Sequence, residues 1–106
     1  TRVTYIKQGT CKKFAIVDAG MNDLVRPALY QAYHEIDNLT SQAECETYDI
    51  VGPICESSDV FAKERKLPAT KRGDILAIRS AGAYGEAMAF GYNCRELPKA
   101  YLSNEL

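Results

Sequence analysis

The sequence predicts a mainly-β domain, a Greek-key-like β-barrel or sandwich that carries only short helical turns. Two observations lead to this prediction. Short runs rich in β-branched and aromatic residues recur along the chain, and clusters of Gly, Pro, Asn, Asp and Ser separate them. The length of 106 residues allows one domain, spanning residues 1–106, and is too short for a deep cofactor cleft together with a barrel to frame it.

A β-hairpin is predicted at the start of the chain, over residues 2–17. Residues 3–7 and 14–17 have strand composition, and Gln8-Gly9-Thr10 supplies the turn between them. After this hairpin, Asn22 is expected to cap a short helical turn, which Pro27 would limit or kink.

The rest of the chain is predicted to contain further short strands. They are expected at residues 32–37, 48–52, 74–79 and 100–102. Residues 60–63 suit a short extended piece, and the Lys- and Arg-rich stretch 63–73 is expected to be a solvated connection. Residues 81–85 are expected to form a loop, and residues 86–90 one helical turn.

Charge and cysteine usage exclude several classes of protein. The chain has 13 basic and 14 acidic residues, whereas nucleic-acid and membrane-surface proteins favour a basic excess. No apolar run approaches the ~20 residues of a membrane span, and the start at Thr1 is expected to be an interior position of a longer protein. The cysteines show no C-x-x-C spacing, so free cytosolic thiols are expected and no metal site; they are Cys11, Cys45, Cys55 and Cys94.

Cys55 and Glu56 are the strongest candidates for chemistry. They follow Gly52-Pro53 and precede Ser57, Ser58 and Asp59, a composition that places side chains on a turn at the end of a strand. A thiol in such a polar, partly exposed setting can donate a proton at neutral pH and recover it. The adjacent carboxylate could hold a substrate ammonium group. The structural alternative is an inert, buried Cys beside an exposed Glu.

Three other residues are candidates for binding. Arg26 and Tyr30 are four apart, so on a helical turn they share one face that suits a bound carboxylate. Tyr84 lies between small residues that leave its ring projecting, able to stack on a flat cofactor or to bond a phosphate. The alternatives are a surface Arg packed on a Tyr, and a core aromatic in a tight turn. His34, the lone His, is expected to be structural, and Asp18 to end a strand rather than bind a metal.

Four segments together resemble the C-terminal part of the diaminopimelate decarboxylase family, which belongs to the alanine-racemase-like, fold-type III class of pyridoxal-phosphate enzymes. The segments are residues 17–30, 51–59, 73–77 and 81–85, and the resemblance runs from about Phe14 to about Arg95. The pairing of Arg26-Pro27-Ala28-Leu29-Tyr30 with the Cys55-Glu56 turn is its most specific feature. Ser58 stands where the family often has Gly, and residues 86–91 are less typical of it.

The resemblance implies a β domain paired with an N-terminal (β/α)₈ barrel that carries the Schiff-base lysine for pyridoxal 5'-phosphate. It implies that Arg26 and Tyr30 grip the substrate carboxylate at the non-reacting end, and that Glu56 contacts the distal amine. It further implies that Cys55 donates the proton after carbon dioxide departs, and that Tyr84 reaches cofactor and substrate.

The Cys-Glu turn of this family enters the active site of the partner subunit, which implies a cytoplasmic homodimer in lysine biosynthesis that converts meso-2,6-diaminopimelate to L-lysine and CO2. The isolated chain is expected to be inactive. Two alternatives stay open: a related ornithine- or arginine-type decarboxylase, whose cationic substrates Arg26 would repel, and a non-catalytic dimerisation module.

Overall fold

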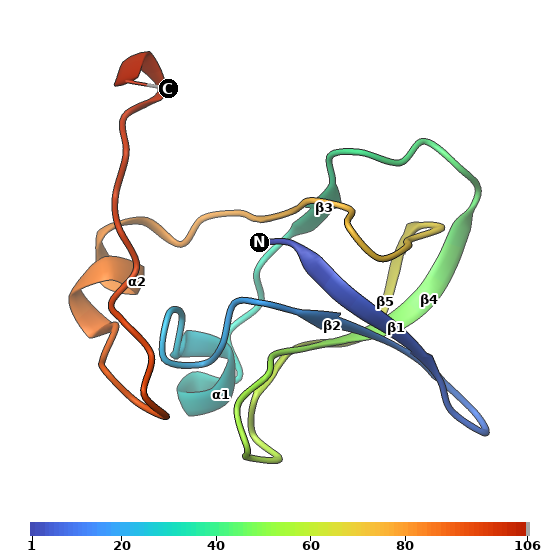
Figure 1. Ribbon diagram of the computed structural model, residues 1–106, viewed down its shortest axis with the longest axis horizontal. Coiled ribbons are helices and arrows are strands. Elements are labelled where there is room, and N and C mark those ends of the chain that lie inside the picture. The colour runs from blue at the N-terminus through green and yellow to red at the C-terminus, as the bar shows by residue number, and fades with distance from the viewer. Residues whose placement is uncertain (106) are drawn as a thin grey trace.

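The computed structural model describes residues 1–105, with the side chain of residue 105 and the whole of residue 106 outside the description (Figure 1). Strands dominate, and the helices are short. The elements are β1 (Val3–Gln8), β2 (Lys13–Val17), α1 (Arg26–Tyr30), β3 (Ile36–Asn38), β4 (Cys45–Val51), β5 (Val60–Pro68), β6 (Leu76–Ile78), α2 (Gly82–Met88) and the 3₁₀ turn η1 (Ser103–Glu105).

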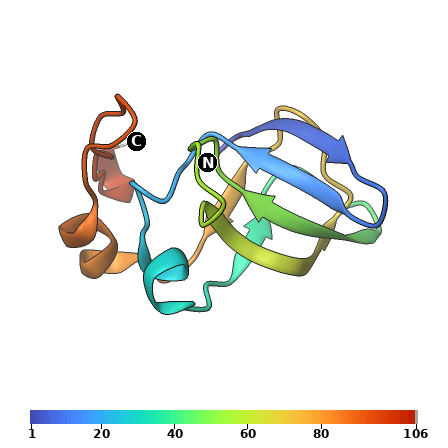
Figure 2. The same ribbon diagram turned by 90° about the horizontal axis from the view of Figure 1, so that it is seen from below.

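The strands form a four-stranded sheet in the order β1-β2-β4-β5 and a two-stranded sheet of β3 and β6. The β1–β2 and β4–β5 pairs are antiparallel, and β2–β4 is parallel. The two sheets meet where Arg2 bridges Ile75 and the amide of Leu76 donates to the carbonyl of Thr1 at 2.8 Å. The predicted mainly-β class is confirmed, and Figure 2 shows the strands curving round a common interior.

The core lies between the sheets. Along β2 the buried residues alternate, with Ala15 and Val17 inward, as a half-buried strand requires. Leu67 from β5 and Leu76 from β6 reach the same cluster. Both views place α1, α2 and the C-terminal segment at one end of the strands (Figures 1 and 2). The strands therefore form the packed core of the domain, and a functional site is expected among the helices and turns at that end.

The hairpin predicted over residues 2–17 is confirmed as β1 and β2. Three other predicted strands are present with shifted ends: β3 is confined to Ile36–Asn38, β4 begins earlier at Cys45, and β6 covers only Leu76–Ile78. His34 lies just before β3 and is buried, and its Nδ1 donates to the carbonyl oxygen of Arg79 at 2.9 Å, which fits a structural role.

The prediction that Asn22 caps a helical turn limited by Pro27 is wrong. The helix α1 begins at Arg26, with Pro27 in its first positions, where its fixed φ suits a helix and its missing N–H is not needed. Asn22 is fully buried instead, and its carbonyl accepts a hydrogen bond from the amide of Phe90 at 3.0 Å.

Two predictions for the second half are also wrong. Residues 63–68 are not a solvated connection, because they belong to β5, in which charged side chains face solvent while Phe61 and Leu67 are buried. Residues 100–102 are exposed and form no strand within the part of the chain that the structure describes. The helical turn expected at residues 86–90 begins earlier, as α2, and takes in most of the loop expected at residues 81–85.

Candidate functional site

Cys55 and Glu56 lie on the turn that joins β4 to β5, and both are exposed. The turn is closed at its base by a hydrogen bond of 3.0 Å from the amide of Gly52 to the carbonyl of Asp59. Inside it, the amide of Glu56 donates to the carbonyl of Ile54 at 2.8 Å, and the Ile54 side chain is buried. The thiol and the carboxylate are thus presented to solvent by a turn that is anchored on both sides of them.

The Glu56 carboxylate has two hydroxyl partners. Tyr92 donates to its Oε1, and the Ser58 hydroxyl donates to its Oε2 at 3.3 Å. The bond to Glu56 raises the pKa of the Tyr92 phenol, because ionising the phenol would remove the donated proton and set two negative charges side by side. The side chain of Glu56 is therefore oriented by a residue that lies 36 positions further along the chain.

Arg26 and Tyr30 occupy the two ends of α1, so the predicted spacing of four residues on one helical turn is present. Arg26 is half-buried and Tyr30 is exposed. The helix ends at Gln31, which has the left-handed φ of 56° and donates its amide to the carbonyl of Arg26. The guanidinium and the phenol are both available to a ligand from outside this chain.

Tyr84 projects from α2 and is exposed, with 74% of its surface accessible. The helix is held from its other side, where Gly85 is buried and a Cβ built on it would lie 3.2 Å from Cδ1 of Leu24. The alternative interpretation, that Tyr84 is a core aromatic in a tight turn, is wrong, because the ring faces solvent.

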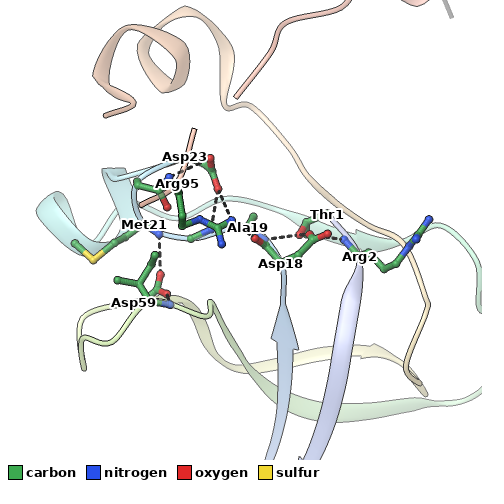
Figure 3. Close-up of polar contacts among 11 residues, drawn as sticks. Thr1, Arg2, Asp18, Ala19, Met21, Asp23, Asp59 and Arg95 are labelled. Carbon is green, nitrogen blue, oxygen red and sulfur yellow. Dashed lines mark hydrogen bonds and ion pairs between the residues drawn. The ribbon is translucent and has the colours of Figure 1, made fainter. Parts of the chain in front are cut away.

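Residues 18–24 connect the three parts of the site, which are the Cys-Glu turn, α1 and α2. Figure 3 shows the polar contacts that hold residues 18–24 in place. The amide of Met21 donates to Oδ1 of Asp59 at 2.7 Å, and the amide of Gly20 donates to Oδ2 of Asp23 at 2.9 Å. Arg95 crosses over this segment, pairing with Asp23 at 3.6 Å and donating to the carbonyl of Asp18. The Cys-Glu turn and the lead into α1 are therefore fixed to one framework.

Two carboxylates of this framework have shifted pKa values in opposite directions. Burial acts to raise the pKa of Asp18, but hydrogen bonds from the Thr1 hydroxyl and the Arg2 amide outweigh it, and the pKa is lowered. Burial also raises the pKa of Asp59, and there it prevails over the bonds from the amides of Ile54 and Met21. Asp59 is the more deeply enclosed of the two.

The structure brings the segments of all five predicted residues to one end of the strands. Within residues 1–105, no hydrogen bond or ion pair joins any two of these side chains. Sequence reasoning missed Tyr92, Asp59 and Arg95 as supports of the site. Only Asp59 carried a local signal, since an Asp closing a Gly-Pro turn commonly accepts backbone N–H bonds.

A groove of about 560 Å³ lies beside the Cys-Glu turn, between α1 and β5. It is lined by Pro27 and Ala28 of α1, by Ser57 and Ser58 of the turn, and by residues of β5. It does not enclose the thiol or the guanidinium. All four cysteines are free and exposed. Within residues 1–105, no cluster of three or more potential metal ligands occurs, and no helix is long and apolar enough to cross a membrane.

The exposed phenol of Tyr84 fits one edge of a phosphate-bearing cofactor such as pyridoxal phosphate, because a phenol can donate a hydrogen bond to a phosphate oxygen. Arg26 supplies a planar set of donors that suits a carboxylate. The donor set fits part of a site for such a cofactor and a carboxylate-bearing ligand.

The described residues form a mainly-β module that presents a thiol, a carboxylate, a guanidinium and a phenol at one end. The family described as "Pyridoxal-dependent decarboxylase, C-terminal sheet domain" matches residues 1–82. The chain therefore belongs to the pyridoxal-dependent decarboxylases, as a C-terminal sheet domain.

Relatives and solved structures agree with this family. The chain is 69% identical, over all its 106 residues, to 28% of the diaminopimelate decarboxylase of Bacteroides thetaiotaomicron. The crystal structure of the Methanocaldococcus jannaschii diaminopimelate decarboxylase superposes with a TM-score of 0.88 at 48% identity, covering 92% of this chain and 22% of that one. The Helicobacter pylori enzyme, solved with L-lysine, gives a TM-score of 0.83 at 50% identity, with 92% and 24% covered. The chain spans about a quarter of the length of these relatives.

Proposed function

We propose that the chain is the C-terminal part of a decarboxylase that converts meso-2,6-diaminopimelate to L-lysine and carbon dioxide. The observation that carries this proposal is the 69% identity of all 106 residues of this chain to 28% of a diaminopimelate decarboxylase. The geometry supports it, because all of the candidate side chains lie on segments at one end of the strands and none of them is buried in the core. A thiol or guanidinium packed in the interior would have argued against the assignment.

Cys55 is proposed to protonate the carbon that loses carbon dioxide. A carbon–carbon bond breaks, a carbon–hydrogen bond forms with the proton from Sγ, and solvent returns a proton to the thiolate afterwards. The thiol is exposed on its turn, so a substrate held by another domain can approach it. When bound, pyridoxal phosphate would supply the electron sink for this reaction.

The other candidates are proposed to select the substrate. Arg26 and Tyr30 would hold the carboxylate at the non-reacting end, and Glu56 would accept a hydrogen bond from the distal ammonium group. Tyr84 would contact both the cofactor and the substrate. Lysine lacks the distal carboxylate and would leave Arg26 unpaired, so the site would favour the substrate over the product.

The proposal requires partners that this chain does not contain. An N-terminal (β/α)₈ barrel would supply the cofactor lysine, and a second copy of the enzyme would receive the Cys55-Glu56 turn in its active site. The exposed state of Tyr30, Tyr84 and Tyr92 suits surfaces that other parts of such an assembly cover. Free, exposed thiols suit the reducing cytoplasm, where we place the enzyme.

The test compares Cys55→Ala with wild type in the full-length enzyme, using carbon dioxide release from meso-diaminopimelate. We expect turnover to fall by about 100-fold or more, the range for loss of a general acid. Cys45→Ala, at an exposed thiol on β4, is the matched control and should retain activity. A fall of less than about tenfold would remove the proton-donor role. A preference for ornithine or arginine in a substrate panel would instead favour the alternative decarboxylase.

A further inference from the structure

Asp59 is buried directly behind the Cys-Glu turn, with 3% of its surface exposed. Its two carboxylate oxygens accept hydrogen bonds from two different parts of the chain. Oδ2 accepts from the amide of Ile54 at 2.7 Å, and Oδ1 accepts from the amide of Met21 at 2.7 Å. One side chain thus joins the turn after β4 to the segment after β2 (Figure 3).

The space around this carboxylate is closely filled. A Cβ built on Gly52 would lie 2.4 Å from Oδ2 and 2.6 Å from Oδ1 of Asp59, and 2.7 Å from the carbonyl oxygen of Ala19. A real Cβ essentially never comes this close to another atom, so the absence of a side chain at residue 52 is what admits the carboxylate. The Asp59 side chain has little freedom to move without losing its donors.

Each of the two donors is coupled to a candidate residue. Ile54 is the neighbour of Cys55 and is itself buried, so a shift of its amide moves the thiol. Met21 begins the segment that passes through buried Leu24 into α1, where Arg26 stands at the first position. A contact of 3.6 Å from the Ser58 hydroxyl to the Met21 sulfur joins the same two segments on the exposed side.

We propose that Asp59 is a positioning residue that sets the Cys55-Glu56 turn and the lead into α1 at a fixed separation. The inference rests on the proposed function, in which Arg26 and Tyr30 hold the substrate carboxylate and the Cys55-Glu56 turn enters the active site of the partner subunit. Asp59 then links the segment that leads into the substrate-binding helix to the turn that carries the proton donor. Its loss is expected to affect both substrate binding and turnover.

The test uses Asp59→Asn in the full-length enzyme. Asparagine keeps the shape but offers one oxygen, so at least one of the two amides then faces an NH2 group. Gly52→Ala is the second variant, because its methyl group displaces the whole carboxylate while Asp59 itself is retained. Asp74→Asn is the matched control. Asp74 is 4% exposed and accepts from the Lys71 amide at 3.0 Å, beyond the opposite end of β5.

Kinetics supply the first readout. In both Asp59→Asn and Gly52→Ala we expect kcat to fall and KM to rise, with kcat/KM lower by about 10- to 100-fold, the effect of a displacement of about 1 Å in a site. Asp74→Asn should stay within about twofold of wild type, because no candidate residue depends on it. If Asp59→Asn also stays within about twofold, or if it changes only stability, the positioning role is wrong.

Deuterium uptake by backbone amides supplies a readout that does not depend on the substrate. In Gly52→Ala we expect faster deuterium uptake in both residues 52–58 and residues 19–24. In Asp59→Asn we expect faster uptake in at least one of these two segments. In Asp74→Asn we expect it in neither. Unchanged uptake in both segments would overturn the inference. If the wild-type enzyme does not decarboxylate meso-diaminopimelate, the proposed function is wrong, but the role of Asp59 is still tested. Deuterium uptake, and kinetics on the substrate that the wild-type enzyme does use, then decide whether Asp59 positions the two segments.

Discussion

Tyr48→Phe gives a test of how a single buried hydroxyl holds the strands together. Tyr48 lies in β4, and 1% of its surface is exposed. Its oxygen accepts a hydrogen bond of 2.8 Å from the amide of Thr70 and donates one of 3.0 Å to Oε2 of Glu46. Burial raises the pKa of this phenol, so it remains protonated and able to fill both roles at neutral pH.

The expected cost follows from the two bonds. Phenylalanine keeps the packing of the ring but leaves the buried Thr70 amide without an acceptor, which costs about 1–3 kcal/mol. Glu46 is exposed and can exchange the lost bond for water, so it adds little. We expect the free energy of unfolding to fall by about 2 kcal/mol, or about 30-fold in the folding equilibrium.

Urea denaturation, followed by both circular dichroism and fluorescence, measures this difference once the two probes are shown to coincide. Tyr5→Phe is the matched control, because Tyr5 is more than half exposed and its change should stay within about 0.5 kcal/mol. Glu46→Ala separates the two bonds, because it removes the acceptor of the Tyr48 hydroxyl, together with the exposed Lys13–Glu46 ion pair, and leaves the bond from the Thr70 amide in place. If it destabilises as much as Tyr48→Phe does, the bond to Glu46 is the important one and the reasoning about Thr70 is wrong.

Three further predictions follow from the same structure. Tyr92→Phe should raise KM for meso-diaminopimelate several-fold at unchanged kcat, because it frees Glu56 without touching Cys55; steady-state kinetics would contradict this by showing a lower kcat alone. Leu67→Ala should destabilise by about 2–5 kcal/mol in urea, through a cavity in the core. For Asp74, bonds from Lys71 and Asn38 outweigh burial and lower the pKa below 3.8, so its stabilisation is present above that pH. The stability gap between wild type and Asp74→Asn should therefore close as the pH falls below 3.8, and a constant gap would refute it.

The parts of the fold that local chemistry determines could be predicted from the sequence. The first hairpin has its turn residues between two strand-forming runs, and the structure contains it. β5 could not be predicted in full, because four successive charged residues, from Lys63 to Lys66, conceal a strand that pairs with β4 through its backbone. Pro27 was correctly expected near a helix, but the sequence does not show whether a proline starts a helix or ends it.

The candidate side chains could be predicted, whereas their supports could not. Cys55 and Glu56 stand out because the turn residues around them are adjacent in sequence. Arg95 bonds the carbonyl of Asp18, 77 positions away in the sequence, and Tyr92 bonds Glu56, 36 positions away. No local sequence pattern predicts either contact. Such contacts depend on how the C-terminal segment returns over residues 18–24, which only the folded chain reveals.

Two of the exposed candidates, Cys55 and Tyr84, are next to a buried residue in the chain. Cys55 follows Ile54, and Tyr84 precedes Gly85; both neighbours are buried. The buried residue fixes the backbone at that point. The exposed side chain next to it makes no contact with the core that would keep it from a ligand. Gly85→Ala tests this arrangement, since its Cβ would lie 3.2 Å from Leu24 and 3.3 Å from Ala81, so that Leu24 or α2 must shift by a few tenths of an ångström. If Tyr84 acts at the cofactor, Gly85→Ala should weaken cofactor binding in the full-length enzyme, measured by fluorescence titration, although residue 85 touches no ligand. An unchanged affinity, with α2 shown to be displaced, would mean that the position of Tyr84 does not matter to the cofactor.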